Sequence, residues 1–127
     1  MKLPLKFLLA TIFITTTSFA QSKGKQVTIT GEVVDVQCYV TGKMGPGRSQ
    51  EHKECAINCA KGGIPLGILE DKTGNLYIAG QTKVAYGSAT KMLLDYVADR
   101  VEVKGHVYAR SGIRYLVINE VKRVSEK

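Results

Sequence analysis

Two segments of the sequence alternate between apolar and polar residues around a central glycine, and they restrict the fold more than any other feature. Val27–Cys38 is apolar at every second position, but the phase of the alternation changes at Gly31. Val101–Arg110 alternates in the same way and carries Gly105 near its middle. Alternation with a period of two indicates β-strands, and an internal glycine indicates a bulge or a sharp bend. The pattern therefore predicts two long strands, each bent at its glycine.

The other predicted elements are shorter. A stripe at three- and four-residue spacing predicts a helix whose apolar side faces the core: Ala89, Met92, Leu93, Tyr96 and Val97. The predicted elements in chain order are the strand Val27–Cys38, the short helix Gln50–Ala60, the hairpin strands Leu66–Leu69 and Leu76–Ala79, the helix Ala89–Ala98, and the strands Val101–Arg110 and Tyr115–Val124. Five strands, with one helix between strands 1 and 2 and one between strands 3 and 4, predict a five-stranded OB-like barrel. The alternative is an open α+β sheet.

The N-terminal segment predicts export. Lys2 and Lys6 precede an uncharged, mostly apolar stretch at Phe7–Phe19, which closes on the small-x-small pattern ending at Ala20. A membrane anchor is the alternative, but this stretch has about 13 residues, whereas a spanning helix needs about 20. We therefore predict a signal peptide at residues 1–20, a lead-in at 21–26 and a single domain at 27–127. The mature protein would be periplasmic or secreted, without a stable membrane anchor.

Composition narrows the classes of partner. The chain has 127 residues and a formal net charge of +7, which falls to +5 when Lys2 and Lys6 are removed with the signal peptide. A basic strip on the last two strands resembles a nucleic-acid surface, but export argues against such a partner. Its residues are Lys104, His106, Tyr108, Arg110, Arg114, Lys122 and Arg123. A metal ion or another exported protein is the expected partner.

All three cysteines and one of the two histidines lie between the first and second predicted strands: Cys38, His52, Cys55 and Cys59. Three sulfur atoms and an imidazole form a ligand set suited to zinc or to copper(I). In a regular helix, Cys55 and Cys59 would have Cβ atoms about 5–6 Å apart, too far for a disulfide but suitable for one metal ion. His52 can join them only if the helix begins at or after His52.

Two other interpretations stay open for this cluster. Cys38 can form a disulfide with Cys55 or with Cys59, which joins the strand to the helix and leaves one thiol. Alternatively, His52 activates a thiolate for redox chemistry. Known catalytic motifs are not recognisable in the sequence, so we predict a non-catalytic metal-binding protein. A periplasmic thiol-redox protein, or an OB module that binds a ligand or partner and has a structural disulfide, is the alternative.

The cysteines and histidine belong to a longer pattern, written G-x-x-x-D-x-x-C-Y, then H-x-x-C-A-x-x-C, then G-x-P, which begins at Gly31 and ends at Pro65. In this respect the chain resembles a group of small exported bacterial proteins with an OB-like C-terminal half. The resemblance implies a secreted domain whose Cys/His cluster is its functional centre, and it implies no particular reaction. It also marks Asp35 and Tyr39 as supporting positions, with Asp35 suited to accept a hydrogen bond from His52.

Overall fold

The computed structural model describes residues 24–43, 45–81 and 88–125. The expected signal peptide lies outside these residues, as do residues 21–23 of the expected lead-in. The described elements are β1 (Lys25–Asp35), α1 (Val36–Thr41), the 3-10 turn η1 (Gln50–His52), α2 (Lys53–Lys61), β2 (Leu66–Glu70), β3 (Leu76–Gly80), α3 (Ser88–Leu93), the 3-10 turn η2 (Leu94–Tyr96), β4 (Arg100–Arg110) and β5 (Ile113–Arg123).

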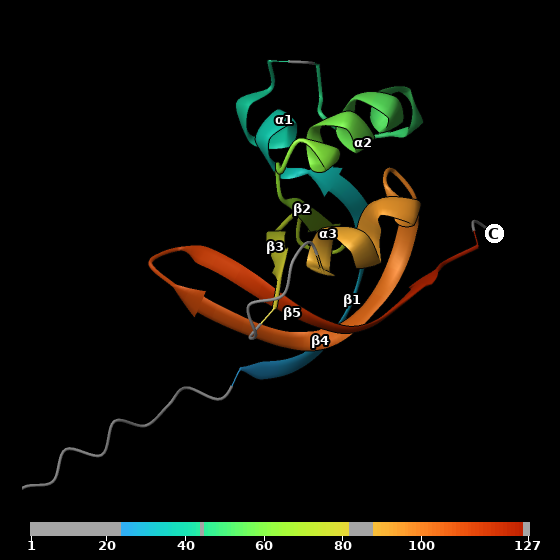
Figure 1. Ribbon diagram of the computed structural model, residues 1–127. Coiled ribbons are helices and arrows are strands. Elements are labelled where there is room, and N and C mark those ends of the chain that lie inside the picture. The colour runs from blue at the N-terminus through green and yellow to red at the C-terminus, as the bar shows by residue number, and fades with distance from the viewer. Residues whose placement is uncertain (1–23, 44, 82–87, 126–127) are drawn as a thin grey trace, which may run out of the picture.

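The strands of the described residues form a closed barrel in the order β1-β2-β3-β5-β4 (Figure 1). Neighbouring strands are antiparallel except β3 and β5, which are parallel and pair from Ile78 with Tyr115 to Gly80 with Val117. This confirms the OB-like barrel predicted from the order of the elements, with helices between strands 1 and 2 and between strands 3 and 4. Closure leaves no free sheet edge, so the alternative of an open sheet is wrong.

Strand β1 joins two parts of the barrel. It pairs with β4 from Lys25 to Glu32 and with β2 from Gly31 to Asp35. A Cβ atom on Gly31 would lie 2.2 Å from the carbonyl oxygen of Leu69, so this position requires glycine because the neighbouring backbone is so close. The sequence predicted a bulge or a sharp bend at Gly31, and the bulge is not present, because the pairing runs through this residue without a shift; Gly31 is where β1 passes from β4 to β2. The register shift lies instead between Lys104 and Gly105, where β4 pairs with β5.

The change of apolar phase along β1 has a different cause from the one predicted. Val33 lies in the core cluster, while Val34, which points to the other face, is also 1% exposed. Helices α1 and α2 pack against β1, and coverage of both faces removes the alternation of burial. The strand was also predicted to continue to Cys38, but it ends at Asp35 and Cys38 lies in helix α1.

The core fills the barrel and extends beneath the helices. The apolar stripe predicted for the helix between strands 3 and 4 is confirmed, since Leu93 and Val97 are fully buried and its other members pack against the core. The regular helix is shorter than predicted, because α3 ends at Leu93 and continues as η2. The buried cluster comprises Ile29, Val33, Ala56, Ala60, Leu66, Ile68, Ala79, Leu93, Val97, Val101, Val103, Leu116 and Ile118.

Helices α1 and α2 both lie over one end of the barrel, at the top of Figure 1, away from the β4–β5 hairpin at the left. Helix α2 contributes Ala56 and Ala60 to the core and thereby covers this end of the barrel. Within the described part of the chain, no helix combines the length and apolar character needed to cross a membrane. The segment between β1 and β2 is thus a folded unit that carries all three cysteines.

Candidate metal centre

Asp35 ends β1 and starts helix α1, and this places Cys38. The Asp35 backbone is extended, and its Oδ1 accepts a hydrogen bond of 2.9 Å from the backbone N–H of Cys38, as an N-cap residue does. Gly42, in the left-handed conformation at φ +62°, ends the helix and donates its N–H to the Cys38 carbonyl. A helix of only six residues, capped at both ends, therefore holds the Cys38 side chain in the interior.

His52 lies where the four-ligand interpretation requires it. Helix α2 begins at Lys53, and His52 is the residue immediately before it, at the end of η1. Cys55 and Cys59 follow in α2, one helical turn apart. The condition set by the sequence, that the helix begin at or after His52, is therefore met.

The side chains of these elements converge on Cys38. The sulfur atoms of Cys38, Cys55 and Cys59 all lie within 4.8 Å of one another. The ligand atoms of Asp35, Cys38 and His52 also lie within 4.8 Å of one another, so Cys38 belongs to both groups. Asp35, Cys38 and His52 are buried, whereas Cys55 and Cys59 are half-buried. The predicted Cys/His cluster is thus assembled, with Asp35 as an additional oxygen donor.

Two polar atoms of the cluster are buried without a hydrogen-bond partner. They are Asp35 Oδ2 and His52 Nε2, and no other such side-chain atom is found in residues 24–43, 45–81 and 88–125. Leaving a buried polar atom unpartnered costs about 1–3 kcal/mol, so each such atom in a folded protein requires an explanation. A metal ion would be a partner for both atoms, because carboxylate oxygen and imidazole nitrogen are ligands for zinc. The donor set therefore fits a metal ion.

The electrostatic environment keeps two of the thiols protonated when no metal ion is bound. Burial, followed by the negative charge of Asp35, raises the pKa of Cys38. The neighbouring Asp35 carboxylate, followed by burial, raises the pKa of Cys59 to about 12. A metal ion binds the thiolate, so binding at neutral pH must release the protons of these thiols.

The three cysteines are free thiols in this structure. The disulfide between Cys38 and Cys55 or Cys59, which the sequence left open, is therefore not formed. Cys55 and Cys59 also form no disulfide with each other, as their spacing of one turn on a helix predicted.

The loop before α2 packs directly on the backbone of α1, a feature that the sequence did not reveal. Gly47 has φ +65°, and a Cβ atom there would lie 2.5 Å from the backbone nitrogen of Tyr39 and 2.6 Å from the carbonyl carbon of Cys38. Only glycine can occupy this position without moving the loop or the helix. Tyr39 itself is half-buried on α1 and belongs to neither group of converging ligand atoms.

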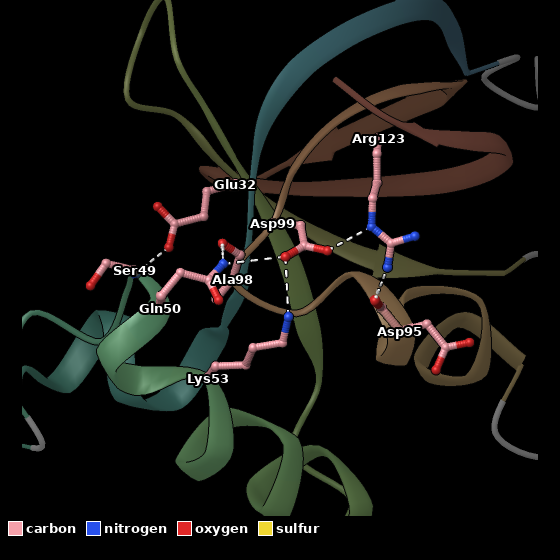
Figure 2. A network of polar contacts seen from close by, with 8 residues as sticks. All are labelled: Glu32, Ser49, Gln50, Lys53, Asp95, Ala98, Asp99 and Arg123. Atoms are coloured by element: carbon pink, nitrogen blue, oxygen red, sulfur yellow. Dashed lines mark hydrogen bonds and ion pairs between the residues drawn. The ribbon is translucent and has the colours of Figure 1, made fainter. Parts of the chain in front are cut away.

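A polar network fastens this segment to the barrel (Figure 2). Gln50 and Lys53, which flank His52, both donate to Asp99 Oδ1 at 3.2 Å, and Arg123 of β5 donates to Asp99 Oδ2 at 2.8 Å. Burial acts to raise the pKa of Asp99, but the hydrogen bonds from these three side chains outweigh it and lower that pKa. The residues beside His52 are therefore held by a carboxylate at the start of β4.

A second contact of the same kind lies nearby. Glu32 of β1 accepts the backbone N–H of Ser49, shown in Figure 2, and forms an ion pair of 3.2 Å with Arg48. Neither Glu32 nor Asp99 was singled out from the sequence, because their partners lie far away along the chain. A Glu or Asp next to a strand carries no signal that distinguishes such a contact from a solvated surface charge.

The basic strip expected on the last two strands is partly neutralised. Lys104 pairs with Glu120 at 3.2 Å, Lys122 with Glu102 at 2.9 Å, and Arg123 with Asp99 at 2.8 Å. His106 lies on β4 and belongs to neither group of metal-ligating side chains. Comparisons of the chain with protein-family models, with curated proteins and with solved structures gave no match.

Proposed function

We propose that this protein is a small exported metal-binding protein that holds zinc or copper(I) in the cluster formed by Cys38, His52, Cys55 and Cys59 and has no catalytic activity. The observation that carries the proposal is the pair of buried polar atoms without partners, Asp35 Oδ2 and His52 Nε2, beside three free thiols. A cation at this place would satisfy both atoms, and it would favour the thiolate form of each sulfur that binds it.

Export is supported by the signal-peptide pattern of residues 1–20. In an oxidising compartment, thiols that are close together tend to form disulfides. A bound metal ion would protect Cys38, Cys55 and Cys59 from this oxidation while keeping them together. The proposal therefore accounts for an odd number of clustered cysteines in an exported chain.

A non-catalytic role is supported by the number of available ligands. Zinc sites with four protein ligands are closed and structural, whereas catalytic zinc keeps one position open for water or substrate. The cluster offers three sulfur atoms, one imidazole and the Asp35 carboxylate, so protein ligands alone can fill all four positions. The resulting site is suited to carrying a metal ion, to sensing it, or to stabilising the segment between β1 and β2.

The test is metal analysis combined with intact mass measurement on protein purified without chelator. We expect about one metal ion per chain, lost in Cys38→Ser and retained in His106→Gln, which changes the other histidine of the sequence. Protein that carries one disulfide, and takes up no zinc or copper(I) after reduction, would contradict the proposal.

The thiol-redox alternative makes a different prediction. It needs a thiolate at neutral pH, which the raised pKa values of Cys38 and Cys59 disfavour. If it held, one cysteine of the metal-free protein would be alkylated much faster than the others below pH 7. Uniform slow labelling of all three cysteines, measured by mass spectrometry of peptides after timed alkylation, would exclude it.

A further inference from the structure

The two groups of converging ligand atoms overlap only at Cys38. Asp35 and His52 occur in the buried group, and Cys55 and Cys59 occur in the half-buried group. From this arrangement we propose that the centre contains two alternative metal sites that share Cys38. The inner site, Asp35–Cys38–His52, takes zinc, the outer site, Cys38–Cys55–Cys59, takes copper(I), and only one of them is filled at a time. This inference rests on the proposed metal-binding function and adds which metal each group selects.

The inner site matches zinc in ligand type and in charge. It offers one carboxylate oxygen, one sulfur and one imidazole nitrogen, all of which bind zinc, and a fourth ligand can come from a neighbouring thiol. A carboxylate and a thiolate carry two negative charges, which balance Zn²⁺ when the imidazole is neutral. All three residues are buried, with at most 8% of any of them exposed, and a buried group is least costly when its net charge is zero.

The outer site matches copper(I). It consists of three sulfur atoms, and soft thiolate ligands select copper(I), whereas harder oxygen ligands do not. Three thiolates around a monovalent ion leave a net negative charge, which is costly in the interior. Cys55 and Cys59 are half-buried, so this charge would be partly solvated. The inner site has harder ligands and is buried, which suits Zn²⁺ in a neutral complex. The outer site has softer ligands and is partly exposed, which suits copper(I) in a negatively charged complex.

Asp35 acts in the inner site as a direct ligand rather than as a hydrogen-bond acceptor for His52. Its Oδ1 is occupied by the backbone N–H of Cys38 at 2.9 Å, while its Oδ2 is fully buried and unpartnered. His52 Nε2 is also unpartnered, so no hydrogen bond joins these two atoms. Asp35 Oδ2 and His52 Nε2 are therefore both free to bind a cation beside the sulfur atom of Cys38.

Exclusive occupancy follows from the shared sulfur. All the other ligand atoms lie within 4.8 Å of Cys38 Sγ, so two metal ions would be held close together on one thiolate. The two ions would have to share the electron pairs of that sulfur, and a shared thiolate binds each ion more weakly than a thiolate that serves one ion alone. Copper(I) that binds the outer site should therefore release zinc from the inner one. No change of oxidation state is involved, since each thiol that binds gives a proton to the solvent and each ion keeps its charge.

The test titrates the reduced full-length protein with Zn²⁺ and, separately, with Cu(I) kept reduced by ascorbate, each against a chelator of known affinity. Two variants each remove a ligand of one site only. His52→Gln should lower the zinc affinity more than about 100-fold, because mutation of a residue that only hydrogen-bonds to a metal ligand already lowers metal affinity about 10- to 100-fold. The same variant should change the copper(I) affinity less than about 10-fold. Cys55→Ser should do the reverse, and Asp35→Asn, which keeps an oxygen to cap α1, should follow His52→Gln.

Controls separate the outcomes. Cys38→Ser should lose both metals, and His106→Gln should lose neither, while the far-UV circular dichroism of every variant reports whether it is folded. Zinc-loaded wild type should release one Zn²⁺ for each Cu(I) added. If His52→Gln and Cys55→Ser weaken both metals equally, or if zinc and copper(I) are bound together, the two-site inference is overturned while the metal-binding function stands. A wild-type protein that binds neither metal would instead overturn the proposed function itself.

Discussion

The contact between Asp99 and the segment that carries His52 can be tested by the isosteric change Asp99→Asn. The wild-type carboxylate accepts Lys53 Nζ at 3.2 Å and Arg123 Nε at 2.8 Å, and its side chain is only 18% exposed. The variant keeps one oxygen for Gln50 and Lys53 but presents an amide N–H₂ group to Arg123, which also donates. The change therefore removes the negative charge and one acceptor together.

The magnitude follows from these contacts. Exposed ion pairs contribute about 0.2–1 kcal/mol each, and a hydrogen bond contributes about 0.5–1.5 kcal/mol. Arg123 is 58% exposed and Lys53 is 36% exposed, so values in the lower half of these ranges apply. We expect Asp99→Asn to lower the free energy of unfolding by about 1.5 kcal/mol, which for a domain of this size lowers Tm by roughly 6–12 °C.

Thermal unfolding of the metal-free, reduced protein, followed by circular dichroism, measures this effect. Glu120→Gln is the matched control, because it removes the same charge from the exposed pair with Lys104, in which the two side chains are 55% and 50% exposed. The control should change stability by less than about 0.5 kcal/mol. If both variants shift Tm equally, or if Asp99→Asn shifts it by less than about 2 °C, the reasoning that Asp99 holds this segment on the barrel is refuted.

Three further outcomes are expected. Because the pKa of Asp99 is lowered in the folded state, its contribution is present above the ordinary carboxyl pKa and is lost as the pH falls through the lowered one. In urea unfolding, the difference between wild type and Asp99→Asn should therefore be constant above about pH 5 and should vanish well below pH 4. Gly31→Ala, whose Cβ would lie 2.2 Å from the Leu69 carbonyl oxygen, should lower the free energy of unfolding by about 3 kcal/mol or more. The control Gly62→Ala, at φ −78° and with its nearest contact at 3.3 Å, should lower it by less than about 1 kcal/mol. Equal losses of stability in the two variants would contradict the close approach of β2 to Gly31. Gly47→Ala should push the loop away from α1 and weaken zinc binding at least about 10-fold, and an unchanged zinc affinity would show that this contact does not position the cluster.

The barrel was predictable because its signals are local. Alternation in the long strands, the hairpin strands Leu66–Leu69 and Leu76–Ala79, and the apolar stripe from Ala89 to Val97 each depend on a few neighbouring residues, and each predicted element is present. The ending of β1 was not predictable in this way. Val36 and Cys38 continue the alternation of the strand. In the sequence, Asp35, which caps α1, looks like any other polar residue within an alternating strand.

The cluster was predictable in its membership and only partly in its geometry. Spacing alone placed Cys55 and Cys59 on one helical face and set the condition on His52, which the structure meets. The contact of Gly47 with α1 and the hold of Asp99 on Lys53 depend on segments that meet only in the folded chain. No local pattern reports such contacts, because a surface aspartate or a loop glycine has the same sequence signature whether or not it has a distant partner.

The cluster and the barrel also differ in how far along the chain their contacts reach. All the candidate ligands lie within residues 35–59, whereas the barrel requires Lys25 to pair with Val107 and Ile78 to pair with Tyr115. Contacts between residues far apart in sequence form slowly, because long loops must close first. We therefore expect the cysteine-bearing segment to organise early in folding and the parallel seam between β3 and β5 to close late. A metal ion present during folding would meet its ligands before the barrel is complete.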